Sequence, residues 1–302
     1  MSEATYVAAG SLDEALDALA SGARPIAGGT DLVVGSRSGA KPMPAAIVAI
    51  HALGELRALD TTDGLRAGAL VSHATLAADP VVAERYTALA DAAAIVGSHA
   101  TRAQGTIGGN VMNGSPAMDT GGPLLCLGGV VTLRSAGGGT RDVPLDALWT
   151  GPGRTSAEPG ELLTAVTLPP VAPGTGSAYV RLEYRRQMEI AVVGATAVVR
   201  LEGDVIAGAR VAITALAPTI RRVPEAEAAL DGSSGDRGAA EAAGAAAAAA
   251  SAPISDNRGS LDYRRAMAAV ITRRAVVAAV ARARDGAGAV PVPASPALHG
   301  AV

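Results

Sequence analysis

The chain has 302 residues, of which 49% are hydrophobic, 18% charged and 2% aromatic, and its formal net charge is −3. This length and apolar content suffice for about two or three packed domains. The weak negative charge argues against nucleic acid or an anionic membrane surface as the partner. A single cysteine, Cys126, excludes a disulfide framework, a thiolate zinc site and an iron–sulfur cluster held by four cysteines of this chain, and we interpret it as a buried apolar side chain.

The N-terminal sequence MSEATYVAAGSLDEALDAL contains acidic residues and lacks a basic segment followed by an apolar core, so it does not resemble a signal peptide. The chain also lacks an uncharged apolar run of about 18 residues, the minimum for a membrane span. These features predict a soluble, cytoplasmic protein.

The first 55 residues are predicted to form a small unit. The apolar spacing after Ser11 predicts a short helix with Ser11 as its cap and Gly22 as its stop. The sequence RPIAGG (24–29) predicts a brief strand that enters a glycine turn, and AAIVAI (45–50) predicts a second strand.

A middle region follows, from residue 56 to residue 176. Asp63-Gly64 predicts a hairpin between two short strands, and LADAAAIVGS (89–98) predicts a helix. Residues 99–129 are too rich in Gly, Asn, Ser and Pro to form one regular element. The segment VAPGTGS (171–177) has the composition of an inter-domain linker.

The rest of the chain is predicted to contain strands followed by helices. The strands are expected in 177–186, 190–203 and 208–216, and the helices in 224–232, the alanine tract 239–250 and 261–284. The last helix carries Arg264, Arg265, Arg273 and Arg274, which we interpret as a solvated face, with a subunit contact as the alternative. Residues 286–302 are expected to be a frayed or extended tail.

Two glycine-rich stretches stand out, AGGTD (27–31) and GTIGGN (105–110), and each follows a short apolar element. Consecutive backbone N–H groups without side chains can form a concave anion site. Either stretch alone is weak evidence, but two together would suit a diphosphate, one stretch for each phosphate. The chain lacks both a G-x-G-x-x-G that opens a helix and a G-x-x-x-x-G-K-[ST], so the pattern predicts a dinucleotide site outside the usual βαβ fold.

These residues resemble a known family. AGGTDL (27–32), TIGGN (106–110) and SPAMD (115–119) are similar to motifs of the FAD-binding subunit or domain of molybdenum hydroxylases, the xanthine dehydrogenase and carbon monoxide dehydrogenase group. Residues 151–163, 180–199 and 254–275 resemble later segments of that family in order and spacing, so the resemblance covers about residues 5–285.

The resemblance implies an α+β fold. A two-part FAD-binding domain of the PCMH/VAO type would comprise residues 1–55 and 56–176. A C-terminal α+β domain, like that of the carbon monoxide dehydrogenase flavoprotein, would comprise 177–285, with the tail 286–302 after it. The resemblance also implies an oxidoreductase subunit of a heterotrimer, with a large molybdopterin subunit and a small [2Fe–2S] subunit as partners. FAD would pass electrons from the partner clusters to an external acceptor such as NAD, oxygen, a quinone or a dye.

The family's cofactor contacts carry over onto matching positions of this sequence. Asp119 matches an acidic residue that contacts FAD, and hydroxyl groups are suitable partners for its carboxylate. Arg181 stands where xanthine dehydrogenases have a lysine. The aliphatic Ile190 favours the xanthine dehydrogenase-like branch, because the carbon monoxide branch tends to have an aromatic residue there. The full set implied to bind FAD is Pro25, Ile26, Ala27, Gly28, Gly29, Thr30, Asp31, Leu32, Val96, Thr106, Ile107, Gly108, Gly109, Asn110, Asp119, Leu163 and Arg181.

The chain shows no acid–base pair or nucleophile of its own, so we predict no catalytic side chain. The histidines have no metal-ligand spacing and are interpreted as structural or surface residues: His51, His73, His99 and His299. Two alternatives stay open. One is a stand-alone flavin-dependent oxidase, which the lack of a candidate base disfavours. The other is a flavin-free assembly subunit, which the intact glycine loops disfavour.

Overall fold

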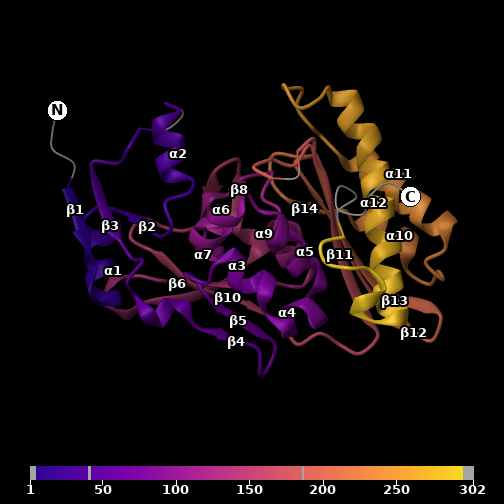
Figure 1. The fold of residues 1–302 in the computed structure, drawn as a ribbon, viewed down its shortest axis with the longest axis horizontal. Coiled ribbons are helices and arrows are strands. Elements are labelled where there is room, and N and C mark those ends of the chain that lie inside the picture. The colour runs from indigo at the N-terminus through magenta and orange to yellow at the C-terminus, as the bar shows by residue number, and fades with distance from the viewer. Residues whose placement is uncertain (1–4, 40–41, 186, 295–302) are drawn as a thin grey trace.

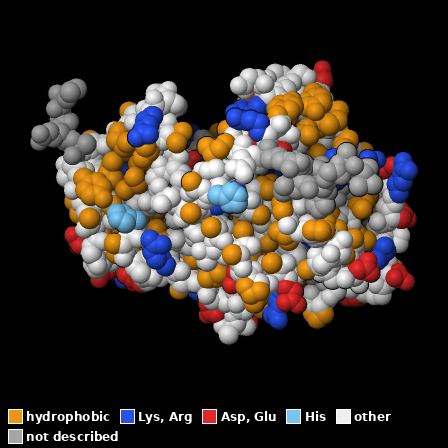
Figure 2. Space-filling model, viewed as in Figure 1, with side chains coloured by type: hydrophobic (Ala, Val, Ile, Leu, Met, Phe, Trp, Pro, Cys, Tyr) orange, Lys and Arg blue, Asp and Glu red, His pale blue; other side chains and the backbone are white. Residues whose placement is uncertain are grey.

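The computed structural model describes residues 5–39, 42–185 and 187–294. Three β-sheets of three or more strands follow one another along an elongated molecule, from the N-terminal part in indigo through the middle part in magenta to the C-terminal part in orange and yellow (Figure 1). A further sheet of two short strands lies within residues 149–155. On the face shown in Figure 2, acidic and basic side chains are interspersed. Among the described residues, no helix has the length and apolar character needed to cross a bilayer.

The N-terminal part contains the predicted helix and both predicted strands. A parallel sheet has the order β1-β3-β2, and α1 packs beside it. The Ser11 hydroxyl accepts a hydrogen bond from the Glu14 backbone N–H at 3.2 Å, which confirms the predicted cap of α1. A short helix, α2, follows the first glycine stretch and was not predicted. The elements are β1 (Thr5–Ala8), α1 (Leu12–Ala20), β2 (Arg24–Ile26), α2 (Leu32–Arg37), β3 (Ala46–Ala49) and a 3₁₀ turn (Gly54–Arg57).

The middle part has an antiparallel sheet of order β4-β5-β10-β6-β7, and its first two strands form the predicted hairpin. Gly64 has φ of +87° in the hairpin loop, a conformation that glycine adopts easily. The strands are β4 (Leu59–Asp60), β5 (Leu65–Gly68), β6 (Val130–Arg134), β7 (Thr140–Pro144), β8 (Trp149–Gly151), β9 (Arg154–Thr155) and β10 (Leu162–Leu168). The helices are α3 (His73–Ala78), α4 (Pro80–Arg85), α5 (Thr87–Ile95), α6 (His99–Gln104), α7 (Ile107–Asn113), α8 (Gly121–Cys126), α9 (Leu145–Leu148) and a 3₁₀ turn (Ala136–Gly138).

The C-terminal part is an antiparallel sheet of order β11-β12-β13-β14 between two layers of helices. Helix α12 packs on one face of β11 and β12, and α5 and α8 of the middle part pack against the sheet as well (Figure 1). Helix α11 lies against α12. The elements are β11 (Thr175–Leu182), β12 (Val193–Glu202), β13 (Val205–Thr214), β14 (Arg221–Arg222), α10 (Pro224–Leu230), α11 (Arg237–Ala250), α12 (Leu261–Asp285) and a 3₁₀ turn (Ala287–Ala289).

The expectations for the linker, the tail and Arg264 need correction. The predicted linker 171–177 ends inside β11, because Thr175, Gly176 and Ser177 pair with β12. The tail does not begin at residue 286. The Ala294 N–H donates to the Asp91 carboxylate at 2.9 Å, and Ala294 is 9% exposed. Residues 295–302, which include His299, lie outside the described residues.

Arg264 does not belong to a solvated face. Its side chain is 4% exposed and bonds the Asp256 carboxylate at 2.5 Å and the Ala215 carbonyl at 3.4 Å, so it fixes the start of α12. Arg265 and Arg274 are exposed, as predicted, and Arg273 is half-buried.

Candidate functional site

The two glycine stretches meet in space, as predicted. A Cβ atom added to Gly28 would lie 1.8 Å from the Gln104 carbonyl oxygen, so the first stretch packs directly on the peptide that precedes Gly105. A Cβ atom at Gly105 would lie 3.5 Å from the Thr30 hydroxyl oxygen. The Asn113 side-chain amide donates to the Asp31 carboxylate at 3.2 Å, which joins the first stretch to α7.

The first stretch presents backbone donors. Gly29 has φ of +71°, which turns the chain sharply between β2 and α2. The backbone N–H groups of Gly28, Gly29 and Thr30 have no hydrogen-bond acceptor in the described part of the chain, and these residues are half-buried. Accessible donors on successive residues of such a turn suit a phosphate oxygen.

The second stretch differs from the concave turn that the sequence predicts. Gly108 and Gly109 lie in the first turn of α7, and Thr106 is its N-cap. The Gly108 N–H donates to the Ala69 carbonyl at 3.0 Å, and the Gly109 N–H donates to the Thr106 hydroxyl at 3.1 Å. A Cβ atom at Gly108 would lie 2.7 Å from the Ala69 Cβ atom. Gly108 therefore permits close packing of α7 against the end of β5, while the first stretch carries the accessible donors.

His73 lies behind this junction. Its backbone N–H donates to the Gly105 carbonyl at 3.2 Å, and its ring carbon Cδ2 would lie 3.3 Å from a Cβ atom at Gly105. The side chain is buried, and Nδ1 has no hydrogen-bond partner among the described residues. Burial, together with the charge of Arg102, lowers the pKa of His73 to about 4, so the imidazole is neutral at physiological pH.

Asp119 and Arg181 form a buried ion pair. The Arg181 guanidinium donates to the Asp119 carboxylate at 2.9 Å, and the Tyr179 hydroxyl donates to the other Asp119 oxygen at 2.7 Å. Burial raises the pKa of the Asp119 carboxyl, opposed by the nearby Arg181 charge. The Thr120 hydroxyl donates to the Asn110 side-chain carbonyl at 2.6 Å, so this pair is connected to α7 and the second glycine stretch.

Sequence reasoning missed two members of this cluster, Tyr179 and Glu183. Arg181 Nε donates to the Glu183 carboxylate at 2.6 Å, and the Arg181 side chain is 0% exposed. Burial alone would lower the pKa of Arg181, but the Asp119 and Glu183 carboxylates outweigh it and hold the pKa above its usual value. Both missed residues lie in or directly after β11 at positions i±2 from Arg181, so alternation along a strand was the signal that could have found them.

The remaining predicted residues lie in varied environments. Val96 caps the end of α5, and its carbonyl accepts from Arg102 at 3.0 Å. Leu163 is 2% exposed and belongs to the apolar core of the middle part. Ile190 is 48% exposed, in the segment between β11 and β12. Met188 of the same segment bonds the Gly97 carbonyl through its backbone N–H at 2.9 Å, which brings this segment beside Val96.

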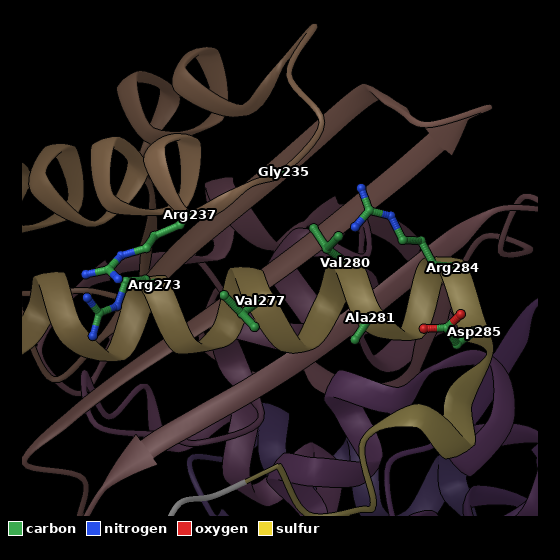
Figure 3. Close-up of a pocket in the computed structure, with 8 residues that line it drawn as sticks. All are labelled: Gly235, Arg237, Arg273, Val277, Val280, Ala281, Arg284 and Asp285. Atoms are coloured by element: carbon green, nitrogen blue, oxygen red, sulfur yellow. The ribbon is translucent and has the colours of Figure 1, made fainter.

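The expectation that Cys126 is a buried apolar side chain agrees with the structure. Cys126 is buried in the apolar core, and burial raises the pKa of its thiol. No group of three or more metal-ligating side chains occurs among the described residues. A surface groove of about 650 Å³ lies between α11 and α12 and contains none of the residues predicted to bind the cofactor (Figure 3).

Three observations fit FAD. The junction holds backbone donors without an acceptor among the described residues, which suit a phosphate. The glycine at its contact point leaves no room for a side chain. The third observation concerns charged groups. Asp119 and Arg181 lie near α7. The Asp119 carboxylate can accept hydrogen bonds from hydroxyl groups of a cofactor, and the Arg181 guanidinium can donate to its carbonyl groups. Fold and site together define a class of protein, the flavin-nucleotide-binding oxidoreductase subunits.

Comparisons with known proteins define the family. Residues 2–171 match the family described as "FAD binding domain in molybdopterin dehydrogenase", and residues 178–279 match "CO dehydrogenase flavoprotein C-terminal domain". The chain therefore belongs to the FAD-binding subunits of the molybdenum hydroxylase family, and its cofactor is FAD. The α+β fold, with a two-part FAD-binding domain and a C-terminal domain, is confirmed.

Individual relatives cover nearly the whole chain. The carbon monoxide dehydrogenase medium chain of Afipia carboxidovorans is 34% identical over 89% of this chain and 93% of the relative. The putative xanthine dehydrogenase FAD-binding subunit of Escherichia coli is 31% identical over 93% of this chain and 97% of the relative. The structure of carbon monoxide dehydrogenase from Hydrogenophaga pseudoflava superposes with a TM-score of 0.88 at 33% identity, covering 93% of this chain and 98% of that chain.

Proposed function

We propose that this protein is the electron-output subunit of a molybdenum hydroxylase. It would receive electrons from the [2Fe–2S] clusters of a small partner subunit and pass them to an external acceptor such as NAD, oxygen or a quinone. Bound FAD supplies the chemistry, because a flavin exchanges electrons singly or in pairs. The chain's own residues bind and orient the cofactor.

The observation that carries this proposal is the contact between Gly28 and the Gln104–Gly105 peptide. It places the accessible N–H groups of the first stretch beside the N-terminal end of α7. The positive end of the α7 dipole adds to these donors, so the junction favours the negatively charged pyrophosphate. Thr30, whose hydroxyl faces the same junction, is positioned to donate as well.

We assign FAD contacts to the full predicted set. The pyrophosphate would lie against Pro25–Leu32 and Thr106–Asn110. Asp119, Val96, Leu163 and Arg181 would contact other parts of the cofactor, and Leu163 would do so through its backbone because its side chain is committed to the core. We also propose that the chain divides into FAD-binding subdomains near the predicted 1–55 and 56–176 and a C-terminal domain near the predicted 177–285. The last domain begins with β11 at Thr175 and includes the segment up to Ala294.

The proposed partners are a large molybdopterin subunit and a small [2Fe–2S] subunit in a cytoplasmic complex. Relatives named "medium chain" and "FAD-binding subunit" support this assignment. A stand-alone oxidase would turn over small substrates without partners. A flavin-free assembly subunit would be colourless and would not be reconstituted by FAD.

The test is the flavin content of the purified protein and of two glycine variants. Gly28→Ala would place a methyl group 1.8 Å from the Gln104 carbonyl oxygen and separate the two stretches, so we expect loss of most bound flavin. Gly54→Ala is the matched control, because no atom lies within 4 Å of its added Cβ. Wild-type protein that lacks flavin and cannot be reconstituted with FAD, or Gly28→Ala protein with full flavin content and native circular dichroism, would contradict the assignment.

A further inference from the structure

The groove in Figure 3 lies beside the start of α11 and the last turns of α12, and it has a volume of about 650 Å³. The two helices run antiparallel. A Cβ atom at Gly244 of α11 would lie 2.5 Å from the Ala269 carbonyl, and one at Gly235, just before α11, would lie 2.7 Å from Val280. The groove therefore lies along a closely packed helix pair, and most of its lining residues belong to α12.

The lining residues form a regular stripe along α12. Arg273, Val277, Ala281 and Arg284 are separated by four, four and three positions, the spacing of one helix face. From Arg273 to Arg284 this stripe is about 16 Å long, at about 1.5 Å per residue. Figure 3 shows the guanidinium groups of Arg273 and Arg237 at one end, Arg284 at the other, and the two small apolar side chains between them.

The floor of the groove is apolar and accessible. Val277 is 52% exposed, in a chain whose other valines on α12 are mostly packed. Isolated exposed apolar residues are common on protein surfaces, but an exposed valine inside a groove with arginines at its ends is not explained by the packing of this chain. An inorganic anion would pair with the arginines but would leave the apolar side chains of Val277 and Ala281 exposed to solvent.

The excess positive charge of the groove lies at the Arg273 end, because Arg284 at the other end has the carboxylate of Asp285 beside it. Arg237 bonds the Glu241 carboxylate at 2.8 Å, and Arg273 lies 3.5 Å from the same carboxylate. Arg284 donates at 2.6 Å to the backbone carbonyl of Ser234, an uncharged acceptor. With Asp285 included, three guanidinium groups face two carboxylates, in a protein whose net charge is −3.

We propose that this groove docks an acidic amphipathic helix of a partner subunit. Such a helix would carry carboxylates about three turns apart, to pair with the arginines at the two ends, and aliphatic side chains between them, to cover Val277 and Ala281. Helices bind to grooves of this kind through an apolar face, and charged residues at the rim set orientation and association rate. The inference rests on the proposed function only in assuming that the chain works in a multi-subunit complex.

The test uses charge reversal within the complex. A tagged copy of the chain is expressed in its native host, the remaining subunits of the complex are isolated with it, and their dissociation constant is measured by biolayer interferometry. We expect the double variant R273E/R284E to bind at least about tenfold more weakly than wild type. Val277→Asp should weaken binding by disrupting the floor. Higher salt should weaken wild-type binding more than that of the double variant.

Arg265→Glu is the matched control, because Arg265 is an exposed arginine on the same helix and does not line the groove. Equal affinities for wild type, the double variant and Arg265→Glu would overturn the proposal. The proposal would also be overturned if no partner were isolated with the wild-type chain. It would be overturned as well if sedimentation showed that the groove residues mediate association with a second copy of the chain. Flavin absorbance of the same samples measures their FAD content and so tests the proposed function independently of docking.

Discussion

At the scale of single residues, the glycines of the two stretches differ in what they do to the backbone. Gly28 and Gly29 free the backbone of the first stretch, so that its N–H groups remain accessible. Gly108 instead removes a side chain that would collide with Ala69. Two similar Gly-Gly pairs therefore have different environments: the first leaves backbone N–H groups without an acceptor among the described residues, and the second permits close packing.

His73 gives the protein a defined sensitivity to acid. In the unfolded chain its imidazole has a pKa of about 6.5, and in the folded protein burial lowers that pKa to about 4. Between these values the unfolded chain binds a proton that the folded protein excludes, so lowering the pH through this window destabilises the fold. The contribution is about 1.4 kcal/mol for each pH unit.

We therefore predict that His73→Gln loses less stability than wild type when the pH falls from 6.5 to 5. Urea denaturation at a series of pH values measures the difference between the two proteins. His51→Gln, which changes an exposed histidine, serves as the control. Parallel pH profiles for wild type and His73→Gln would show that the folded protein does not exclude this proton.

At the scale of elements, close packing of β11 on α12 depends on one small residue. A Cβ atom at Gly176 would lie 2.2 Å from the Ala279 carbonyl oxygen and 2.3 Å from the Ala283 backbone nitrogen. Neither backbone atom can move without shifting the helix. Gly208, on β13 of the same sheet, has no atom within 4 Å of its added Cβ.

We predict that Gly176→Ala destabilises the protein by about 3 kcal/mol, because the methyl group overpacks the contact between strand and helix. Gly208→Ala should be neutral within about 0.5 kcal/mol, as for surface substitutions in general. Thermal unfolding of both variants measures these values. A stable Gly176→Ala protein would mean that α12 is not held at this distance from the sheet.

Much of the element order was predictable from the sequence, because local signals were strong. Ser11 and Gly22 bounded α1, and Asp63-Gly64 marked the hairpin. Region 99–129 was harder. Its glycines favour turns by local propensity, yet Gly108 and Gly109 are helical. Thr106 caps α7, and this part of the helix packs so closely on Ala69 that only a residue without a side chain fits at position 108.

The contact between the two glycine stretches was predictable from the sequence, whereas the pairing within the charged cluster was not. Asp119 and Arg181 were found through resemblance, but their pairing joins positions 62 residues apart, and no local pattern reports such a contact. The same reason explains the tail. Ala294 is fixed by Asp91, at a separation of 203 residues, so its order depends on the assembled fold.

At the scale of the whole molecule, a buried ion pair fastens the C-terminal helix to the middle part. Arg282 of α12 donates to both oxygens of Asp91 of α5, at 2.6 Å and 2.9 Å, and both side chains are almost completely buried. The Tyr179 and Ala294 N–H groups donate to the same carboxylate. This fully bonded carboxylate joins α5, β11, α12 and the C-terminal segment.

We predict that Arg282→Met costs about 3–5 kcal/mol, because it leaves a buried carboxylate without its cation. It should also uncouple the two parts. Trp149, the only tryptophan, reports on the middle part by fluorescence, while far-UV circular dichroism reports on the whole chain. Urea transitions by the two probes should coincide in wild type and separate in Arg282→Met.

Arg200→Met, which removes a partly exposed pair with Glu202, is the control and should cost less than about 1 kcal/mol. A small effect of Arg282→Met, with coincident transitions, would show that the two parts are coupled by apolar contact alone.

We propose that FAD is held by its pyrophosphate at the junction of the two glycine stretches. Calorimetric titration of the deflavinated protein with FAD and with riboflavin, which lacks phosphate, measures this directly. We predict one FAD per chain and binding of riboflavin at least about 100-fold weaker, about 2.7 kcal/mol, because charge-assisted hydrogen bonds to phosphate are lost. Riboflavin binding as tight as that of FAD would contradict the claim.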